Sequence, residues 1–250
     1  MNRRWCVVTP YYKENRDILE RCLDSVRRQT VPAEHIVVAD GHPQDWLDGA
    51  GVRHIRLDRS HNDYGNAARG IGAMLAVAEN YDGIAFLDAD NWYDPDHVEA
   101  CLAAADASPA RPDFVAAQRR FVRLDGSPMP QSPKDQPIAA HIDTNCYFFF
   151  PMSYHVINKW CTIPQIMAAH GDELFYHYCV SENITFAVTD RRTVNYTCLF
   201  AFCYQQLNEV PPPEAKPQVN WFATQHWLAS LPAEEFAVVQ RRTGLYLKMD

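Results

Sequence analysis

Short apolar runs and amphipathic stretches alternate along roughly the first 100 residues of the chain. The apolar runs predict buried strands over 5–9, 35–40, 52–57 and 84–87. The amphipathic stretches predict helices that begin after Asn15, cover 66–80, and begin again at Asp94-Pro95. Asn15 and Asp94 are the predicted N-caps, and proline suits the first helical position. Strands that alternate with helices imply a mainly parallel sheet with helices on both faces.

The second half of the chain is less regular. Apolar and aromatic runs predict a helix over 172–180 and strands over 114–123, 142–150, 185–188 and 193–197. The segment 126–137 contains four prolines, which predict a loop that could cover a site as a lid. Consecutive prolines at 211–213 predict a stiff linker. We therefore divide the chain into a domain over 1–208 and a tail over 209–250, made of this linker and two short helices.

Composition and charge narrow the class of protein. The chain has 250 residues, of which 47% are hydrophobic and 22% are charged, as expected of one α/β domain with at most a small appendage. The formal net charge of −8 argues against a nucleic-acid partner, which would require a basic face. No apolar run reaches the roughly 18 residues of a transmembrane segment, and the apolar start is too short for a secretory signal. We therefore expect a cytoplasmic protein, with peripheral attachment to a membrane left open.

Acidic side chains follow two of the predicted strands. Asp40 ends the second strand, and Asp88 and Asp90 directly follow the fourth. The carboxyl ends of parallel strands meet at one edge of a sheet, where ligands bind in such folds. Two carboxylates two residues apart can converge on a hard cation such as Mg²⁺ or Mn²⁺, which would neutralise a diphosphate leaving group. A D-x-D pair also occurs in turns and helix caps, so the prediction depends on its position after a buried strand.

Four stretches resemble, in the same order, motifs of the family 2 glycosyltransferases, which transfer a sugar from a nucleotide-diphosphate donor. They are Val7–Tyr12 (VVTPYY), Ile36–Gly41 (IVVADG), Gly65–Gly72 (GNAARGIG) and Phe86–Asp90 (FLDAD). The second half of the chain matches the family only loosely. The resemblance implies the GT-A fold, which is an α/β, Rossmann-like fold with a mixed, mainly parallel sheet flanked by helices.

The resemblance also implies roles for residues of the first two motifs. Thr9, Pro10 and Tyr11 would line a pocket for the nucleotide base. Tyr11 could stack on the base, or it could be an ordinary aromatic residue of the core or surface. Asp40 would accept a hydrogen bond from the uracil ring of a UDP donor, or it could belong to an exposed turn with no such role.

The other two motifs would bind the phosphate end of the donor. Arg69 would face the diphosphate, since a guanidinium matches phosphate oxygens, or it could lie on the helix surface. Asp88 and Ala89 would contact the donor, and Asp88 and Asp90 would bind Mn²⁺ or Mg²⁺. No histidine stands where some family members have a third metal ligand. The ion would then be held by Asp90, the diphosphate and water.

An inverting transfer needs a general base that accepts the proton of the acceptor hydroxyl. In the family this base is an aspartate near the start of a helix, and the resemblance assigns Asp172, with Glu173 as the alternative. Asp172 could also simply cap that helix. Four histidines are available nearby, and for each of them a structural role is favoured over metal binding. They are His141, His155, His170 and His177.

These features predict an inverting, metal-dependent glycosyltransferase that acts on a carbohydrate, lipid-linked or other hydroxyl acceptor in polysaccharide or glycoconjugate synthesis. The Q-x-x-R-W signature of processive members is absent, which favours single additions. Trp221, Phe222 and Trp227 in the tail could meet a lipid-linked acceptor or form a homodimer, but packing onto the domain is favoured. The alternatives are a nucleotidyltransferase, which the lack of glycine at 10–13 disfavours, and a subunit that binds a nucleotide sugar without catalysis.

Overall fold

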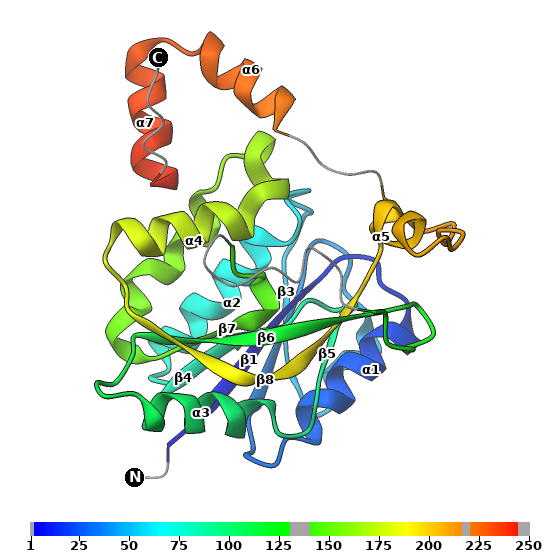
Figure 1. Ribbon diagram of the computed structural model, residues 1–250. Helices are drawn as coiled ribbons and strands as arrows, with labels where there is room; N and C mark the ends of the chain where they lie inside the picture. Colours follow the sequence, from blue (N-terminus) through cyan, green and yellow to red (C-terminus); the bar gives the residue numbers. More distant parts are fainter. Residues whose placement is uncertain (1–2, 131–140, 217–220, 245–250) are drawn as a thin grey trace.

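An eight-stranded sheet forms the centre of the computed structural model, which describes residues 3–130, 141–216 and 221–244 (Figure 1). The strand order is β3-β2-β1-β4-β7-β6-β8-β5. The strands are β1 (Trp5–Tyr11), β2 (Glu34–Ala39), β3 (Arg53–Arg56), β4 (Gly83–Phe86), β5 (Trp92–Tyr93), β6 (Phe114–Val122), β7 (Tyr147–Phe149) and β8 (Phe186–Thr197). Strands β1 to β4 run parallel, β7 runs antiparallel to both neighbours, and β8 runs parallel to β6. The mixed, mainly parallel sheet is confirmed.

Helices cover both faces of this sheet, with α2 and α4 on one side and α1 and α3 on the other (Figure 1). The helices are α1 (Arg16–Arg27), α2 (Asn66–Ala78), α3 (His97–Ala107), α4 (Gly171–Ser181), α5 (Ala201–Gln206), α6 (Phe222–Ser230) and α7 (Ala233–Thr243). The 3₁₀ segments are η1 (Asp45–Gly49), η2 (Thr144–Cys146), η3 (Pro151–Thr162) and η4 (Gln165–His170). Every residue of β1 is buried, as expected of a strand with helices on either face.

The two predicted N-caps have different outcomes. Asn15 caps α1, since its side chain accepts a hydrogen bond of 3.0 Å from the amide of Ile18. Asp94 is wrong as a cap, because α3 begins only at His97. The carboxylate of Asp94 is instead held by β8, where Asn195 Nδ2 donates to it at 2.8 Å. A contact with a distant strand has therefore replaced the local one.

Two predicted strand boundaries are also wrong. The strand predicted over 142–150 shortens to β7, because Asp143 caps the 3₁₀ turn η2 and accepts a hydrogen bond of 3.0 Å from the amide of Asn145. The strands predicted over 185–188 and 193–197 form a single strand, β8. This strand follows β6 through register shifts, which explains why its apolar pattern is interrupted in the sequence.

The tail packs back onto the domain, as favoured from the sequence. Leu228 of α6 and Phe236 and Val239 of α7 form an apolar cluster with Met167 of η4 and Leu174 of α4. The boundary after residue 208 stays a prediction. Among the described residues, no helix combines the length and the apolar character that are needed to cross a membrane.

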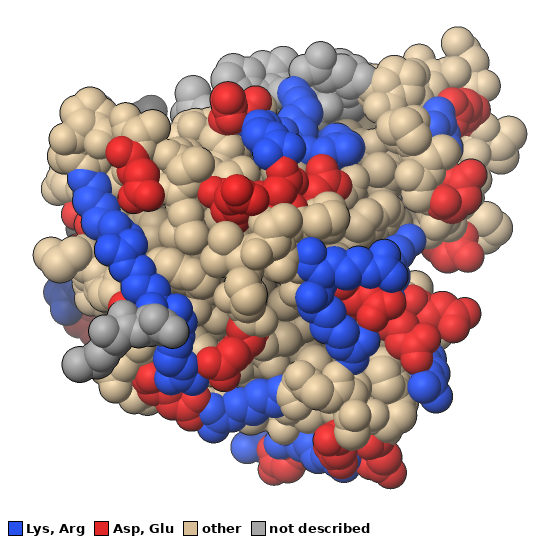
Figure 2. Space-filling model, turned by 90° about the horizontal axis from the view of Figure 1, so that it is seen from below, with Lys and Arg blue, Asp and Glu red and all other residues tan. Residues whose placement is uncertain are grey.

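The segment predicted as a lid over 126–137 falls largely outside the described residues. Its described start is a turn after β6, in which Gly126 has a φ of 84° and its amide donates to the carbonyl of Arg123 at 2.8 Å. Figure 2 shows the side of the molecule on which β1 begins. Acidic and basic side chains are interspersed over the described part of this face, unlike a continuous basic surface.

A substitution at Gly72 would test how closely α2 packs on the sheet. A Cβ atom at this position would lie 2.7 Å from Val8 Cγ1 and 2.8 Å from Val38 Cγ2. We expect Gly72→Ala to lower the free energy of unfolding by about 1–3 kcal/mol, because this overpacking outweighs the gain in helix propensity. Urea denaturation measures the change. Gly49→Ala is the control, since no atom lies within 4 Å of its added Cβ, and equal effects of the two substitutions would contradict the prediction.

Candidate functional site

A cavity of about 680 Å³ opens where β1, β2 and β4 end. The turn after β4, the loop before α2, the junction of η4 and α4, β8 and Lys216 complete its wall. Parallel strands bring their carboxyl ends to the same edge of the sheet, and the loops that follow them diverge there to leave a crevice. The cavity therefore lies where the sequence placed the candidate site.

Most of the predicted site residues come together around this cavity. They are Pro10, Tyr11, Asp40, Arg69, Asp88, Ala89, Asp90 and Asp172. Thr9 and Glu173 do not line it. Successive residues of a strand point to opposite faces, and the Thr9 hydroxyl lies inside the fold, 2.7 Å from His35 Nε2. The carboxylate of Glu173 faces the tail, where it accepts a hydrogen bond of 3.2 Å from Trp221 Nε1.

Tyr11 is a core residue although it borders the cavity. Its side chain is only 2% exposed, its hydroxyl lies 2.9 Å from His54 Nε2, and it accepts a hydrogen bond of 2.8 Å from the amide of Gln44. Core packing is thus observed for Tyr11, and stacking on a base stays a prediction. The neighbouring Tyr12 is 41% exposed and also lines the cavity, so it presents a more open aromatic face for a planar ring.

Asp40 is a buried carboxylate held by the loop that precedes α2. The amide of His61 donates to it at 3.1 Å, and His61 Nδ1 lies 2.6 Å from Oδ1. Two residues of this loop that line the cavity, Asn62 and Tyr64, have positive φ angles of 50° and 59°. The turn at Gly41 approaches the same loop so closely that a Cβ there would lie 2.3 Å from the amide nitrogen of Ser60. These contacts fix Asp40 at the wall of the cavity.

Asp88 is bound by two neighbours from other elements. Arg69 of α2 donates to its Oδ1 at 2.6 Å, and Asn145 Nδ2 donates to its Oδ2 at 3.1 Å. Arg69 also donates to Asn66 at 2.9 Å, and its guanidinium lies over the ring of Trp160. The role predicted for Arg69, a contact with the diphosphate, must therefore compete with its ion pair to Asp88.

Asp90 differs from Asp88 because only its own backbone amide, and no other described residue, donates a hydrogen bond to its carboxylate. Burial raises the pKa of Asp90 to about 7, and the negative charge of Asp88 adds to this effect. A nearby cation would stabilise the charged form of this carboxylate, which burial and Asp88 disfavour. The described residues include no group of three or more His, Cys, Asp or Glu side chains arranged as a metal site. The Asp90 carboxylate is an oxygen donor of the kind that Mg²⁺ and Mn²⁺ prefer.

Asp172 forms an ion pair that the sequence did not predict. His141 Nε2 lies 2.6 Å from its Oδ2, and the amide of Glu173 donates to Oδ1 at 2.8 Å. Burial alone would raise the pKa of Asp172, but the hydrogen bond and charge of His141, with the charge of Arg119, outweigh burial and lower it. Burial likewise opposes the charge on His141, and Asp172 outweighs it and raises the pKa of this imidazole. Asp172 is therefore a carboxylate at neutral pH.

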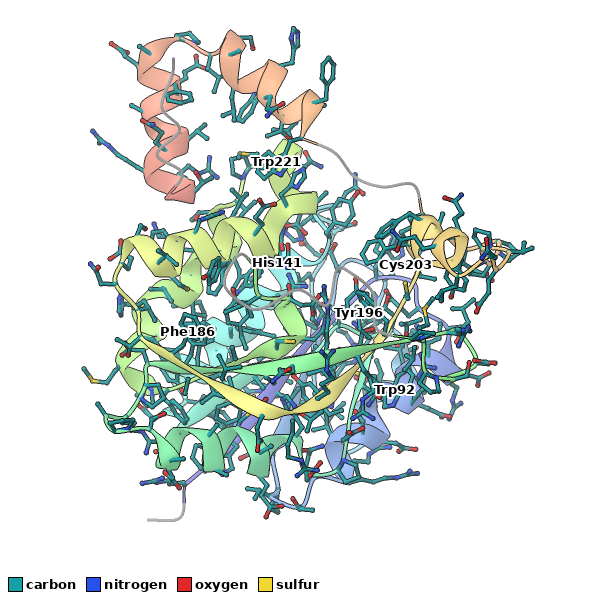
Figure 3. All side chains as sticks on the ribbon, viewed as in Figure 1. Trp92, His141, Phe186, Tyr196, Cys203 and Trp221 are labelled. Atoms are coloured by element: carbon teal, nitrogen blue, oxygen red, sulfur yellow. The ribbon has the colours of Figure 1, made fainter. Side chains whose placement is uncertain are left out.

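Asp172 is a member of the first turn of α4 rather than its N-cap, which is His170. Figure 3 shows that His141 and Tyr196 lie between the sheet and the helices above it, with Trp221 of the tail farther out. The guanidinium of Arg119 of β6 lies over the ring of Tyr196 and forms an ion pair with Asp143. No local pattern marks His141 or Tyr196 as site residues, since both reach the cavity region only through the order of the strands.

A sequence model described as "Glycosyl transferase family 2" matches residues 6–177 of the chain, which is more than half of it. The chain belongs to glycosyl transferase family 2. The curated relatives match shorter stretches. The succinoglycan biosynthesis protein ExoW of Rhizobium meliloti (strain 1021) is 35% identical over 99 residues, which cover 37% of this chain and 31% of ExoW. The putative glycosyltransferase EpsH of Bacillus subtilis (strain 168) is 27% identical over 90 residues, which cover 35% of this chain and 26% of EpsH. The matched stretches thus cover about a third of the length of ExoW and about a quarter of the length of EpsH.

Solved structures similar to this family member include those of S. aureus TarS. One TarS structure superposes with a TM-score of 0.61 at 16% identity and covers 99% of this chain and 46% of TarS. Another, of TarS 1–349 in complex with UDP-GlcNAc, has a TM-score of 0.63 at 14% identity and covers 96% and 72% of the two chains. At this identity the likeness establishes the fold, and the predicted GT-A fold is confirmed.

Proposed function

We propose that this family 2 member is a metal-dependent, inverting glycosyltransferase that uses a UDP-sugar and adds single sugars to a hydroxyl acceptor. The observation that supports it most is one cavity bordered by an unpaired carboxylate, Asp90, and by an ion-paired carboxylate, Asp172. The first suits a cation beside a diphosphate, and the second suits proton transfer from an acceptor. The proposed reaction needs both chemistries, and this proposal is supported by the fact that Asp90 and Asp172 line one cavity.

The donor is proposed from the shape and polarity of the cavity together with the family membership. Its volume of about 680 Å³ lies within the range of small-molecule sites. Asp40 lies at the wall, where its oxygens, already held by His61, could accept one further hydrogen bond from a uracil N–H. TarS, which has the same fold, has been crystallised with UDP-GlcNAc, and this supports a UDP-sugar as the donor class.

The metal is proposed as Mn²⁺ or Mg²⁺, held by Asp90. A bound divalent ion would neutralise the charge that develops on the departing diphosphate. Asp88 would be a ligand only if its ion pair with Arg69 or its hydrogen bond with Asn145 rearranged. We therefore assign Asp90 as the principal protein ligand and Asp88 as the residue that orders its surroundings.

Asp172 is proposed as the general base. Its carboxylate would accept the proton of the acceptor hydroxyl while the hydroxyl oxygen bonds to the anomeric carbon of the donor sugar. The bond from that carbon to the diphosphate breaks on the opposite side, so one displacement inverts the configuration and releases UDP. Two existing hydrogen bonds, from His141 and from the amide of Glu173, orient the carboxylate for this step.

The proposed function is tested by incubating the purified full chain with Mn²⁺, a panel of nucleotide sugars and a panel of saccharide acceptors. We expect release of UDP that depends on both the acceptor and the metal, and a product of inverted anomeric configuration by NMR. Release of pyrophosphate from a nucleoside triphosphate and a sugar phosphate would instead indicate a nucleotidyltransferase. Binding of UDP-sugars without turnover across all acceptors would indicate a binding subunit.

A further inference from the structure

Lys216 reaches the cavity from the segment that follows the proline run. The amide of Lys216 donates to the carbonyl of Leu199 at 2.8 Å, and a parallel bridge joins Lys216 to Phe200 just after β8. Just before the proline run, Glu209 accepts hydrogen bonds of 2.6 and 2.9 Å from Arg123, which directly follows β6. These contacts anchor the segment to the domain at two points. The position of Lys216 is therefore set by the fold.

The charge around the cavity is strongly negative. Six carboxylates line it, from Glu14, Asp40, Asp63, Asp88, Asp90 and Asp172. Among the described residues that line it, the lysines and arginines are Arg69 and Lys216. A doubly charged diphosphate cannot enter such a space favourably unless cations offset this field.

The two basic residues differ in the interactions that their side chains already make. Arg69 is buried, donates to Asp88 at 2.6 Å, and donates to Asn66 at 2.9 Å. Lys216 is exposed, and no described residue forms an ion pair with its ammonium group. Lys216 and Asp90, the carboxylate assigned to the metal, line the same cavity. A donor whose phosphates meet Asp90 would therefore enter the space that Lys216 borders.

We propose that Lys216 binds the diphosphate of the nucleotide donor, so that the described residues 207–216, which follow α5, complete the donor site. This inference rests on the proposed function, since it assumes a nucleoside diphosphate in the cavity. An ammonium group on a flexible stem can follow the phosphates as the bond to the sugar breaks. It would offset part of the charge on the UDP that leaves.

The test compares the affinities of the full-length wild type and of Lys216→Met for UDP and for uridine, by titration at fixed Mg²⁺. We expect the affinity for UDP to fall about tenfold or more, as for the loss of one hydrogen bond to a charged group. The affinity for uridine, which lacks phosphate, should not change. Lys216→Arg should retain most of the affinity for UDP, and the dependence of UDP affinity on salt should weaken in Lys216→Met.

Lys159→Met is the matched control, because the ammonium of Lys159 lies over the ring of Tyr178 and not at the cavity. It should bind UDP as the wild type does. If Lys216→Met keeps the full affinity for UDP, the role of Lys216 is overturned and the proposed function stands. A parallel loss of uridine and UDP binding also overturns it, because this would indicate a structural role. If the wild type binds neither UDP nor any UDP-sugar, the proposed function itself is overturned.

Discussion

Asp90→Asn is expected to reduce sugar transfer about a thousandfold, which is the order of effect that loss of several kcal/mol of charge stabilisation produces. The amide keeps the size of the side chain but removes the negative charge that would hold Mn²⁺ or Mg²⁺. Since no other described residue donates a hydrogen bond to this carboxylate, the substitution breaks no described hydrogen bond with another residue. The melting temperature should therefore stay the same or rise.

The measurements are turnover with excess UDP-sugar and the affinity for Mn²⁺ in the presence of UDP. Asp106→Asn is the control, because Asp106 is an exposed carboxylate of α3. No residue of α3 lines the cavity. Asp88→Asn offers a second comparison and should lower stability, because it weakens the ion pair with the buried Arg69. Wild-type turnover in Asp90→Asn would refute the proposed metal site.

Asp172→Asn is expected to lower the rate of transfer by about 10²–10⁴-fold, the range for loss of a general base. The affinity for UDP should change little, because the nucleotide base and the diphosphate of the donor are proposed to meet Asp40 and Asp90 rather than Asp172. Steady-state rates and a separate UDP titration distinguish the two effects. Glu173→Gln is the matched control, since the Glu173 carboxylate faces Trp221 rather than the cavity. If Glu173→Gln loses transfer and Asp172→Asn keeps it, the base is Glu173.

The ion pair between Asp172 and His141 predicts how the activity depends on pH. His141 helps to lower the pKa of Asp172 against the effect of burial, so His141→Gln should raise that pKa. The base acts as a carboxylate, and activity is lost as the pH falls through its pKa. The acid limb of the profile of kcat/KM against pH should therefore move to higher pH in His141→Gln. An unchanged acid limb would mean that another group governs it.

Local patterns in the sequence were sufficient for much of the fold. The apolar runs of β1, β2 and β4 were recognisable because strands covered on both faces are almost entirely apolar. By contrast, β5 and α5 were not predicted. They are short, with little periodic pattern of their own, and β5 is held by pairing with β8. The failure of Asp94 as a cap has the same origin, since a distant partner in β8 outweighed the local preference.

The sequence alone determined the family, the kind of sheet and the acidic residues at its edge, because a strand and the turn that follows it are written in consecutive residues. Only the tertiary structure decided what each side chain does at that edge. It paired Arg69 with Asp88 and left Asp90 without a donor from any other described residue. It also buried the Thr9 hydroxyl in the core and brought His141 to Asp172. Lys216 reaches the cavity by the same means. Such pairings join residues that are far apart in the chain, and the order of the strands, which no local pattern encodes, sets which of them meet.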